Sequence, residues 1–220
     1  MNNLFSYESK FMQFMLTVAD YIILNLVYIA CCIPIFTIGA AQSGLYSGLR
    51  VLQDKEDDSS PLRAFFRGFK NGFGSITLVW GISAVIIGLI AYVILAVYVF
   101  ESADFAGAAI PLWMSIVAAL LAIIYQSMLP LFHSRFSCTT GQLVRNVLYV
   151  ILANPLQSII LALALWLPVI LLAVQYAVFL QISLIFIFMY YSVAMGFAMR
   201  LLEKSFKRLT DNFLKSAETN

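Results

Sequence analysis

The sequence predicts an all-α integral membrane protein with six transmembrane helices arranged as three hairpins. Of its 220 residues, 62% are hydrophobic and only 11% are charged, whereas a soluble domain is about 45–50% apolar and about 25% charged. Several apolar segments reach the roughly 20 residues that a helix needs to cross about 30 Å of hydrocarbon. Basic residues gather in every second connection between these segments. We expect a single polytopic membrane domain over residues 1–200 and a cytoplasmic amphipathic tail over 201–220.

The second predicted span is shorter than the others. Pro34 removes a backbone donor and ends the first helix, and Thr37 is a typical N-cap for the next one. A helix from Thr37 to Leu52 is about 24 Å long, which local thinning of the bilayer accommodates. Turning back into the membrane is favoured because its apolar residues would otherwise meet water. The predicted spans are residues 11–33, 37–52, 74–100, 108–132, 155–174 and 176–199.

The positions of lysine and arginine predict the orientation, because these residues collect on the cytoplasmic side of a membrane. The chain has 13 of them, all in residues 50–72, residues 133–145, residues 200–215 or at Lys10. Six spans place all thirteen inside, with both termini cytoplasmic. The alternative of five spans leaves the N-terminus and Lys10 outside.

Small residues form two neighbouring stripes along the predicted second span. In lipid, such a face lets helix backbones approach closely, so we expect it to pack on the first helix. The alternative is that this face lines a solute path or docks a helix of a partner. The predicted close-packing face consists of Gly39, Ala40, Ser43, Gly44, Ser47 and Gly48.

Two amphipathic helices are expected at the cytoplasmic interface. In SPLRAFFRGFKNGF, residues 60–73, the apolar side carries Phe65, Phe66 and Phe69. The other side carries basic residues, as in helices that lie on a membrane surface. A second helix, residues 139–155, is broken at its end by Asn154 and Pro155. Such a helix either anchors the chain on anionic lipid or docks a cytoplasmic partner, and the basic residues concerned are Arg63, Arg67 and Lys70.

Polar residues inside the predicted spans are the other candidates for function. Asp20 lies near the middle of the first span and Asn25 follows it, and an intramembrane carboxylate is costly enough to suggest a role. They act either as structural contacts or in handling protons or solutes. Gln126 is expected to hydrogen-bond across helices, and His133 to lie at the interface.

The sequence shows no enzyme motif of the metalloprotease, nucleophile-elbow or phosphate-loop type. We therefore expect no enzymatic activity, no cofactor and no metal site. The net charge of +2 gives no reason to expect a nucleic-acid partner. A solvated turn accounts for Glu101 and Asp104, which would be the carboxylate pair of a membrane enzyme.

Three segments resemble the YesL-like family of small bacterial membrane proteins, a domain of unknown function. They are LNLVYIACCIPIFTIGAA at 24–41, FFRGFKNGF at 65–73 and RNVLYVILANP at 145–155. The resemblance covers residues 10 to 200 and implies a multi-pass protein of the bacterial cytoplasmic membrane. Genes of this family often lie beside carbohydrate ABC importers, which implies an accessory role in sugar uptake. The family supplies no catalytic residues.

The expected function is thus that of a non-enzymatic accessory or regulatory subunit of a carbohydrate ABC importer. Its partners would be the permease or ATPase subunits and anionic lipids. One alternative is a stand-alone small-solute transporter or channel whose path is lined by Asp20, Asn25 and the small-residue helix. Another is a membrane enzyme of glycan metabolism.

Overall fold

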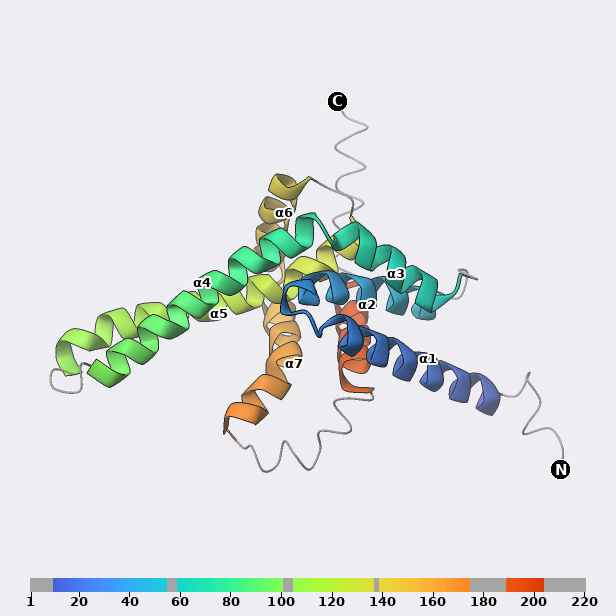
Figure 1. Cartoon of the computed structure of the whole chain (residues 1–220), viewed down its shortest axis with the longest axis horizontal. Coiled ribbons are helices and arrows are strands. Elements are labelled where there is room, and N and C mark those ends of the chain that lie inside the picture. Colours follow the sequence, from blue (N-terminus) through green and yellow to red (C-terminus); the bar gives the residue numbers. More distant parts are fainter. Residues whose placement is uncertain (1–9, 55–58, 101–104, 137–138, 175–188, 204–220) are drawn as a thin grey trace.

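The computed structural model describes residues 10–54, 59–100, 105–136, 139–174 and 189–203. Within these ranges the chain forms helices and no strand, in line with the predicted all-α class (Figure 1). After α7, residues 189–203 are again helical. The elements are α1 (Lys10–Cys31), η1 (Ile35–Thr37), α2 (Ile38–Gln53), α3 (Pro61–Gly72), α4 (Ser75–Phe100), α5 (Phe105–Arg135), α6 (Thr140–Ala153) and α7 (Pro155–Val174).

Three helical segments in the described part of the chain are long and apolar enough to cross a membrane: Phe11–Cys31, Ser75–Ala96 and Leu112–Arg135. The pair α6 and α7 makes a fourth if it counts as one span, although it bends by 108° at its break. These helices agree with a membrane protein. The count of six spans stays a prediction, because α2 has only 16 residues and the sixth predicted span lies mostly outside the described residues.

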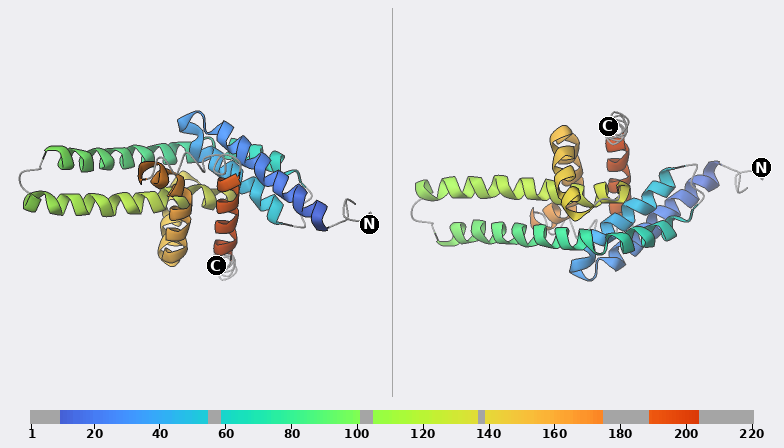
Figure 2. Two further views of the ribbon diagram at one scale, coloured as in Figure 1. Left: turned by 90° about the horizontal axis from the view of Figure 1, so that it is seen from below. Right: turned by 90° about the horizontal axis from the view of Figure 1, so that it is seen from above.

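The helices radiate from a centre that contains α2. The α4–α5 hairpin projects to one side and α1 extends to the other, while α7 runs across both directions (Figure 1). The two views of Figure 2 show that α4 and α5 lie side by side along their length. Side chains on the outer part of this hairpin, such as Leu89 and Met114, are more than 60% exposed, which suits a surface that faces lipid.

The break before α2 lies at Pro34. Helix α1 ends at Cys31, and Pro34 precedes the short helix η1. Thr37 is the residue before α2, as expected, but its hydroxyl does not cap an N–H of α2. The hydroxyl instead donates hydrogen bonds to the carbonyl oxygens of Cys31 and Pro34, each at 2.6 Å. It therefore ties the turn together on the α1 side.

Helix α2 is enclosed by its neighbours, and its glycines are the points of closest approach. A Cβ atom on Gly39 would lie 2.7 Å from the Trp80 ring of α4. One on Gly44 would lie 2.9 Å from the carbonyl oxygen of Phe65 in α3. One on Gly48 would lie 2.9 Å from a Leu24 methyl of α1 and 3.0 Å from the Pro61 carbonyl oxygen. The predicted close-packing face is thus shared among three helices rather than packed on α1 alone.

Helix α3 packs on α2 through small residues of its own. Gly68 and Gly72 meet Ser43 and Ser47 of α2, and Ala64 is buried one turn earlier. Since these three small residues recur every four positions, they form a stripe that lets the two antiparallel backbones come close. This stripe was not identified from the sequence, which drew attention to the phenylalanines instead.

The predicted break at Asn154 and Pro155 falls where α6 ends and α7 begins. Pro155 opens α7, where a missing N–H costs nothing. The Asn154 carbonyl oxygen accepts a hydrogen bond from the Ser158 hydroxyl at 2.8 Å. At the other end of α6, Thr139 and Gln142 form a capping box. Both ends of α6 are therefore defined by local side-chain chemistry.

We expect Gly44→Ala to destabilise the protein, because the added methyl group meets the α3 backbone, which cannot turn aside. Overpacking of this kind costs about 1–3 kcal/mol. The free energy of unfolding, measured by titration with a denaturing detergent, tests this. Gly81→Ala is the matched control, since no atom lies within 4 Å of its added methyl group. Equal stability of the two variants would contradict the close approach of α2 and α3.

Candidate functional site

A cavity of about 400 Å³ lies at the centre of the helices. It is bordered by α1, α2, α4, α5, α7 and the helical residues 189–203. Its size falls in the range of about 300–1,000 Å³ that is typical of small-molecule sites. Most of its surface is apolar. The residues that supply aromatic rings or polar groups are Tyr28, Cys32, Gln42, Trp80, Gln126, Ser127, Trp166 and Tyr191.

Two glutamine side chains on this cavity each have a buried carbonyl oxygen without a hydrogen-bond partner. These are the Oε1 atoms of Gln42 and Gln126, and Gln126 as a whole is only 4% exposed. The sequence predicts that Gln126 bonds across helices, but its carbonyl oxygen has no such bond. A buried unsatisfied acceptor costs about 1–3 kcal/mol, so both atoms favour a ligand that donates hydrogen bonds.

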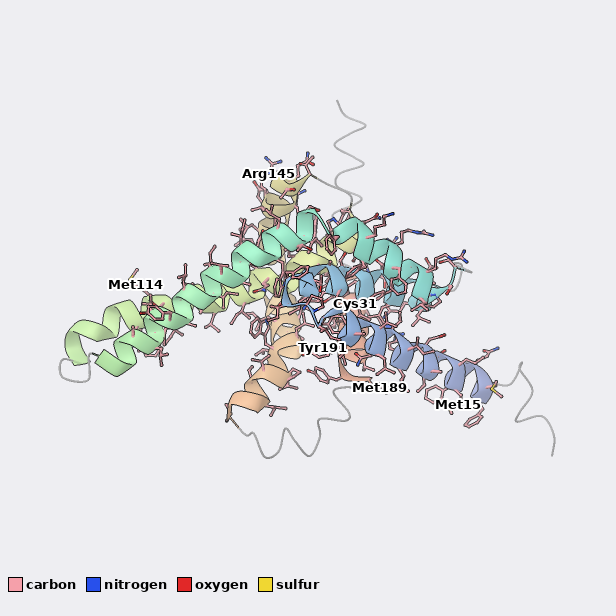
Figure 3. The ribbon with its side chains drawn as sticks, in the orientation of Figure 1. Met15, Cys31, Met114, Arg145, Met189 and Tyr191 are labelled. Carbon is pink, nitrogen blue, oxygen red and sulfur yellow. The ribbon has the colours of Figure 1, made fainter. Side chains whose placement is uncertain are left out.

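Aromatic rings give the cavity its shape. The rings of Tyr28 and Tyr191 lie 5.3 Å apart between centroids, and the side chains of Tyr28 and Gln42 share a hydrogen bond. Figure 3 labels Tyr191 and Cys31 near the centre of the molecule, whereas Met114 lies far out on the α4–α5 hairpin. None of the described residues lining the cavity is charged. The chemistry therefore suits an uncharged ligand with hydrogen-bond donors.

The two intramembrane polar residues predicted from the sequence do not line this cavity. Asn25 is fully buried, and its Oδ1 accepts a hydrogen bond from the backbone N–H of Ser192 at 3.1 Å. The Ser192 hydroxyl lies 3.4 Å from the same oxygen. Asn25 thus joins α1 to the helical residues 189–203. Asp20 lies on α1, half-buried, outside the lining of the cavity.

The outer surface of α3 is the second candidate region. Phe65 is fully buried, and Phe69 is half-buried beside it, with ring centroids 6.4 Å apart. Phe66 is different, because it is 50% exposed although the sequence grouped it with the other two. It shares the outer surface with basic side chains at helical spacing. We call this surface the outer face of α3, and it consists of Arg63, Phe66, Arg67 and Lys70, all exposed.

Other predicted chemistry finds no site in the described part of the chain. Glu101 and Asp104 lie outside the described residues. Among the residues that the structure describes, no group of three or more His, Cys, Asp or Glu side chains could hold a metal ion.

The aromatic residues of the cavity were missed in the sequence because they come from segments far apart in the chain. Trp80, Trp166 and Tyr191 each look like an ordinary apolar residue of a span. Two amides offered a signal. Gln126 was identified but was assigned a bond across helices, and Gln42 is an amide in a helix otherwise made of small and apolar residues up to Tyr46.

We expect Asn25→Leu to destabilise the protein by about 1–3 kcal/mol, because the Ser192 N–H would lose its partner inside the helices. The same denaturing-detergent titration measures the change. Thr17→Val is a suitable control, as the Thr17 hydroxyl donates a hydrogen bond within its own helix, to the carbonyl oxygen of Gln13. A loss no larger than that of the control would show that the Asn25 contact contributes nothing.

Comparison with known proteins gives one match. Residues 21–94 match the model of a family described as a protein of unknown function, DUF624. Neither the curated proteins nor the solved structures give a match. The matched segment runs from the middle of α1 to near the end of α4 and contains all of α2 and α3. This part of the chain, which holds the close-packed centre and the outer face of α3, is similar to DUF624.

Proposed function

We propose that this protein is a non-enzymatic accessory or regulatory membrane subunit that binds its partner through the outer face of α3. The observation that carries the proposal is that three cations and an aromatic ring are exposed together on a helix whose opposite side is locked onto α2. Arginine and aromatic residues are enriched among the residues that dominate binding energy at protein interfaces.

The rigid seating of α3 favours docking over simple membrane anchoring. A helix that only anchors a chain on lipid needs an apolar face turned toward the membrane. In α3 the residues Phe65 and Gly68 are buried against protein instead, and the apolar side chains of Leu62 and Phe66 are the ones exposed. A surface held in place by backbone contacts loses little conformational entropy when a partner binds. Anionic lipid remains the second binding partner of this face.

The partner that we propose is a permease or ATPase subunit of a carbohydrate ABC importer. This assignment rests on the resemblance to the YesL-like family. It also agrees with the predicted orientation in the bacterial cytoplasmic membrane, which places α3 on the cytoplasmic side, where such an importer carries its ATPase subunits. The C-terminus, and with six spans the N-terminus too, would lie on that same side.

The test is a charge reversal of the outer face, Arg63→Glu, Arg67→Glu and Lys70→Glu in one variant. We expect normal protein levels, because all three side chains are exposed, but about tenfold or greater loss of co-purifying importer subunits and slower sugar uptake in the native host. The control reverses two exposed cations elsewhere, Arg145 and Arg200. Unchanged co-purification and uptake in the triple variant would refute the proposal.

A second candidate function is that of a stand-alone small-solute transporter or channel. It is favoured by the central cavity and by the unpartnered carbonyl oxygens of Gln42 and Gln126. The path would then differ from the one expected from the sequence, because these amides rather than Asp20 and Asn25 face the cavity.

Flux measurements in proteoliposomes separate the two functions. If the protein is an accessory subunit, the purified wild type transports no member of a panel of neutral sugars and polyols. Saturable flux that Gln126→Leu abolishes would establish the transporter instead. Gln13→Leu, at an exposed position of α1, controls for the loss of an amide as such.

A further inference from the structure

A second cavity, of about 520 Å³, lies beside α2 and has the opposite character. It is formed where the end of α3, the start of α4 and the end of α5 meet α2. Its lining is mostly polar, unlike that of the central cavity. The polar side chains that matter here are Ser43, Asn71, Ser75, His133 and Arg135.

The donors in this cavity outnumber the groups that could repel an anion. Arg135 contributes a guanidinium, a charged group that carries only N–H donors, and it is only partly exposed. Asn71 adds an amide. None of the described residues lining the cavity is acidic. A guanidinium with amide and hydroxyl donors around a space of this size is the usual chemistry for binding phosphate-type oxyanions.

The hydroxyl groups divide into two sets. The Ser47 and Ser134 hydroxyls already donate to carbonyl oxygens of their own helices, at 2.9 and 2.7 Å. The Ser43 and Ser75 hydroxyls instead lie 3.4 Å from the two ring nitrogens of His133. A separation of 3.4 Å is long for a hydrogen bond. The contacts between these two hydroxyls and the imidazole are therefore weak, so the three groups can reorient toward a ligand.

The charges around the cavity also favour binding of an anion. The positive charges of Arg50 and Arg135 repel each other, and the attraction of Glu203 for Arg135 offsets this in part. Arg135 is partly exposed whereas Arg50 is exposed, and the repulsion between them costs free energy that a bound anion would lower. Among the described residues that line the cavity, the one permanently charged side chain is the cation Arg135.

We propose that this cavity binds a phosphate-type oxyanion, with Arg135 and Asn71 as its principal donors and Ser43 and Ser75 as secondary ones. The anion is either a free phosphate or the phosphate of a lipid headgroup, because the cavity lies at the end of the helices that the basic residues assign to the cytoplasmic interface. The proposal does not depend on partner docking, since it uses none of the residues on the outer face of α3.

The experiment uses the full chain purified in an uncharged detergent. One arm measures the thermal unfolding midpoint as potassium phosphate is added, against potassium chloride at equal ionic strength. The other arm measures the same midpoint for the protein in phosphatidylcholine nanodiscs with and without phosphatidylglycerol. The variants are Arg135→Gln and Asn71→Leu, and the control is Arg145→Gln at an exposed position of α6.

We expect saturable stabilisation of the wild type and of the control, with apparent affinity about tenfold or more weaker in Arg135→Gln, as for loss of a charge-assisted hydrogen bond. A response to phosphate identifies a free oxyanion, and a response only to phosphatidylglycerol identifies a lipid headgroup. Asn71 is exposed and outside the core, so Asn71→Leu decides the question if Arg135→Gln fails to fold. No response in either arm, or equal responses in all variants, would overturn the proposal.

Discussion

The close approach of α2 to its neighbours is the contact on which the rest of the structure depends. Three glycines bring the α2 backbone against α4, α3 and α1 at distances that a methyl group would not allow. In a membrane, helices gain little from burying apolar surface against each other, so such close contact and its dispersion energy carry the association. Because α2 is enclosed in this way, α3 is fixed on it, and the outer face of α3 is presented as a rigid surface.

The same helix separates two cavities of different chemistry. Gln42 turns toward the apolar, aromatic cavity, while Ser43, the next residue, turns toward the polar one beside Arg135. Since α2 forms a wall of both cavities, a ligand that binds in one cavity and shifts α2 would change the shape of the other cavity. A regulatory subunit in which binding of an anion or a small neutral molecule alters partner binding at α3 would need this kind of coupling between sites.

Local signals in the sequence predicted much of the fold, but little of the candidate sites. Pro34 marked the break before α2, and Asn154 with Pro155 marked the break before α7, because proline acts on its own backbone and on the residue before it. The central cavity could not be predicted in this way. It joins Gln42, Trp80 and Tyr191 from distant parts of the chain, and no local period records that they meet. The outer face of α3 was half predicted, since Phe66 belongs with the cations rather than with Phe65.

The position of α2 in the chain also has a consequence for biogenesis. The glycines of α2 meet α1, α3 and α4, but α2 also contacts α5, which ends at Arg135. The part of α2 that faces α5 therefore stays uncovered until about 80 further residues have been synthesised. The segment similar to DUF624 stops at residue 94, before α5 begins. That segment holds the wall between the cavities, but neither cavity is complete without α5, which supplies lining residues to both.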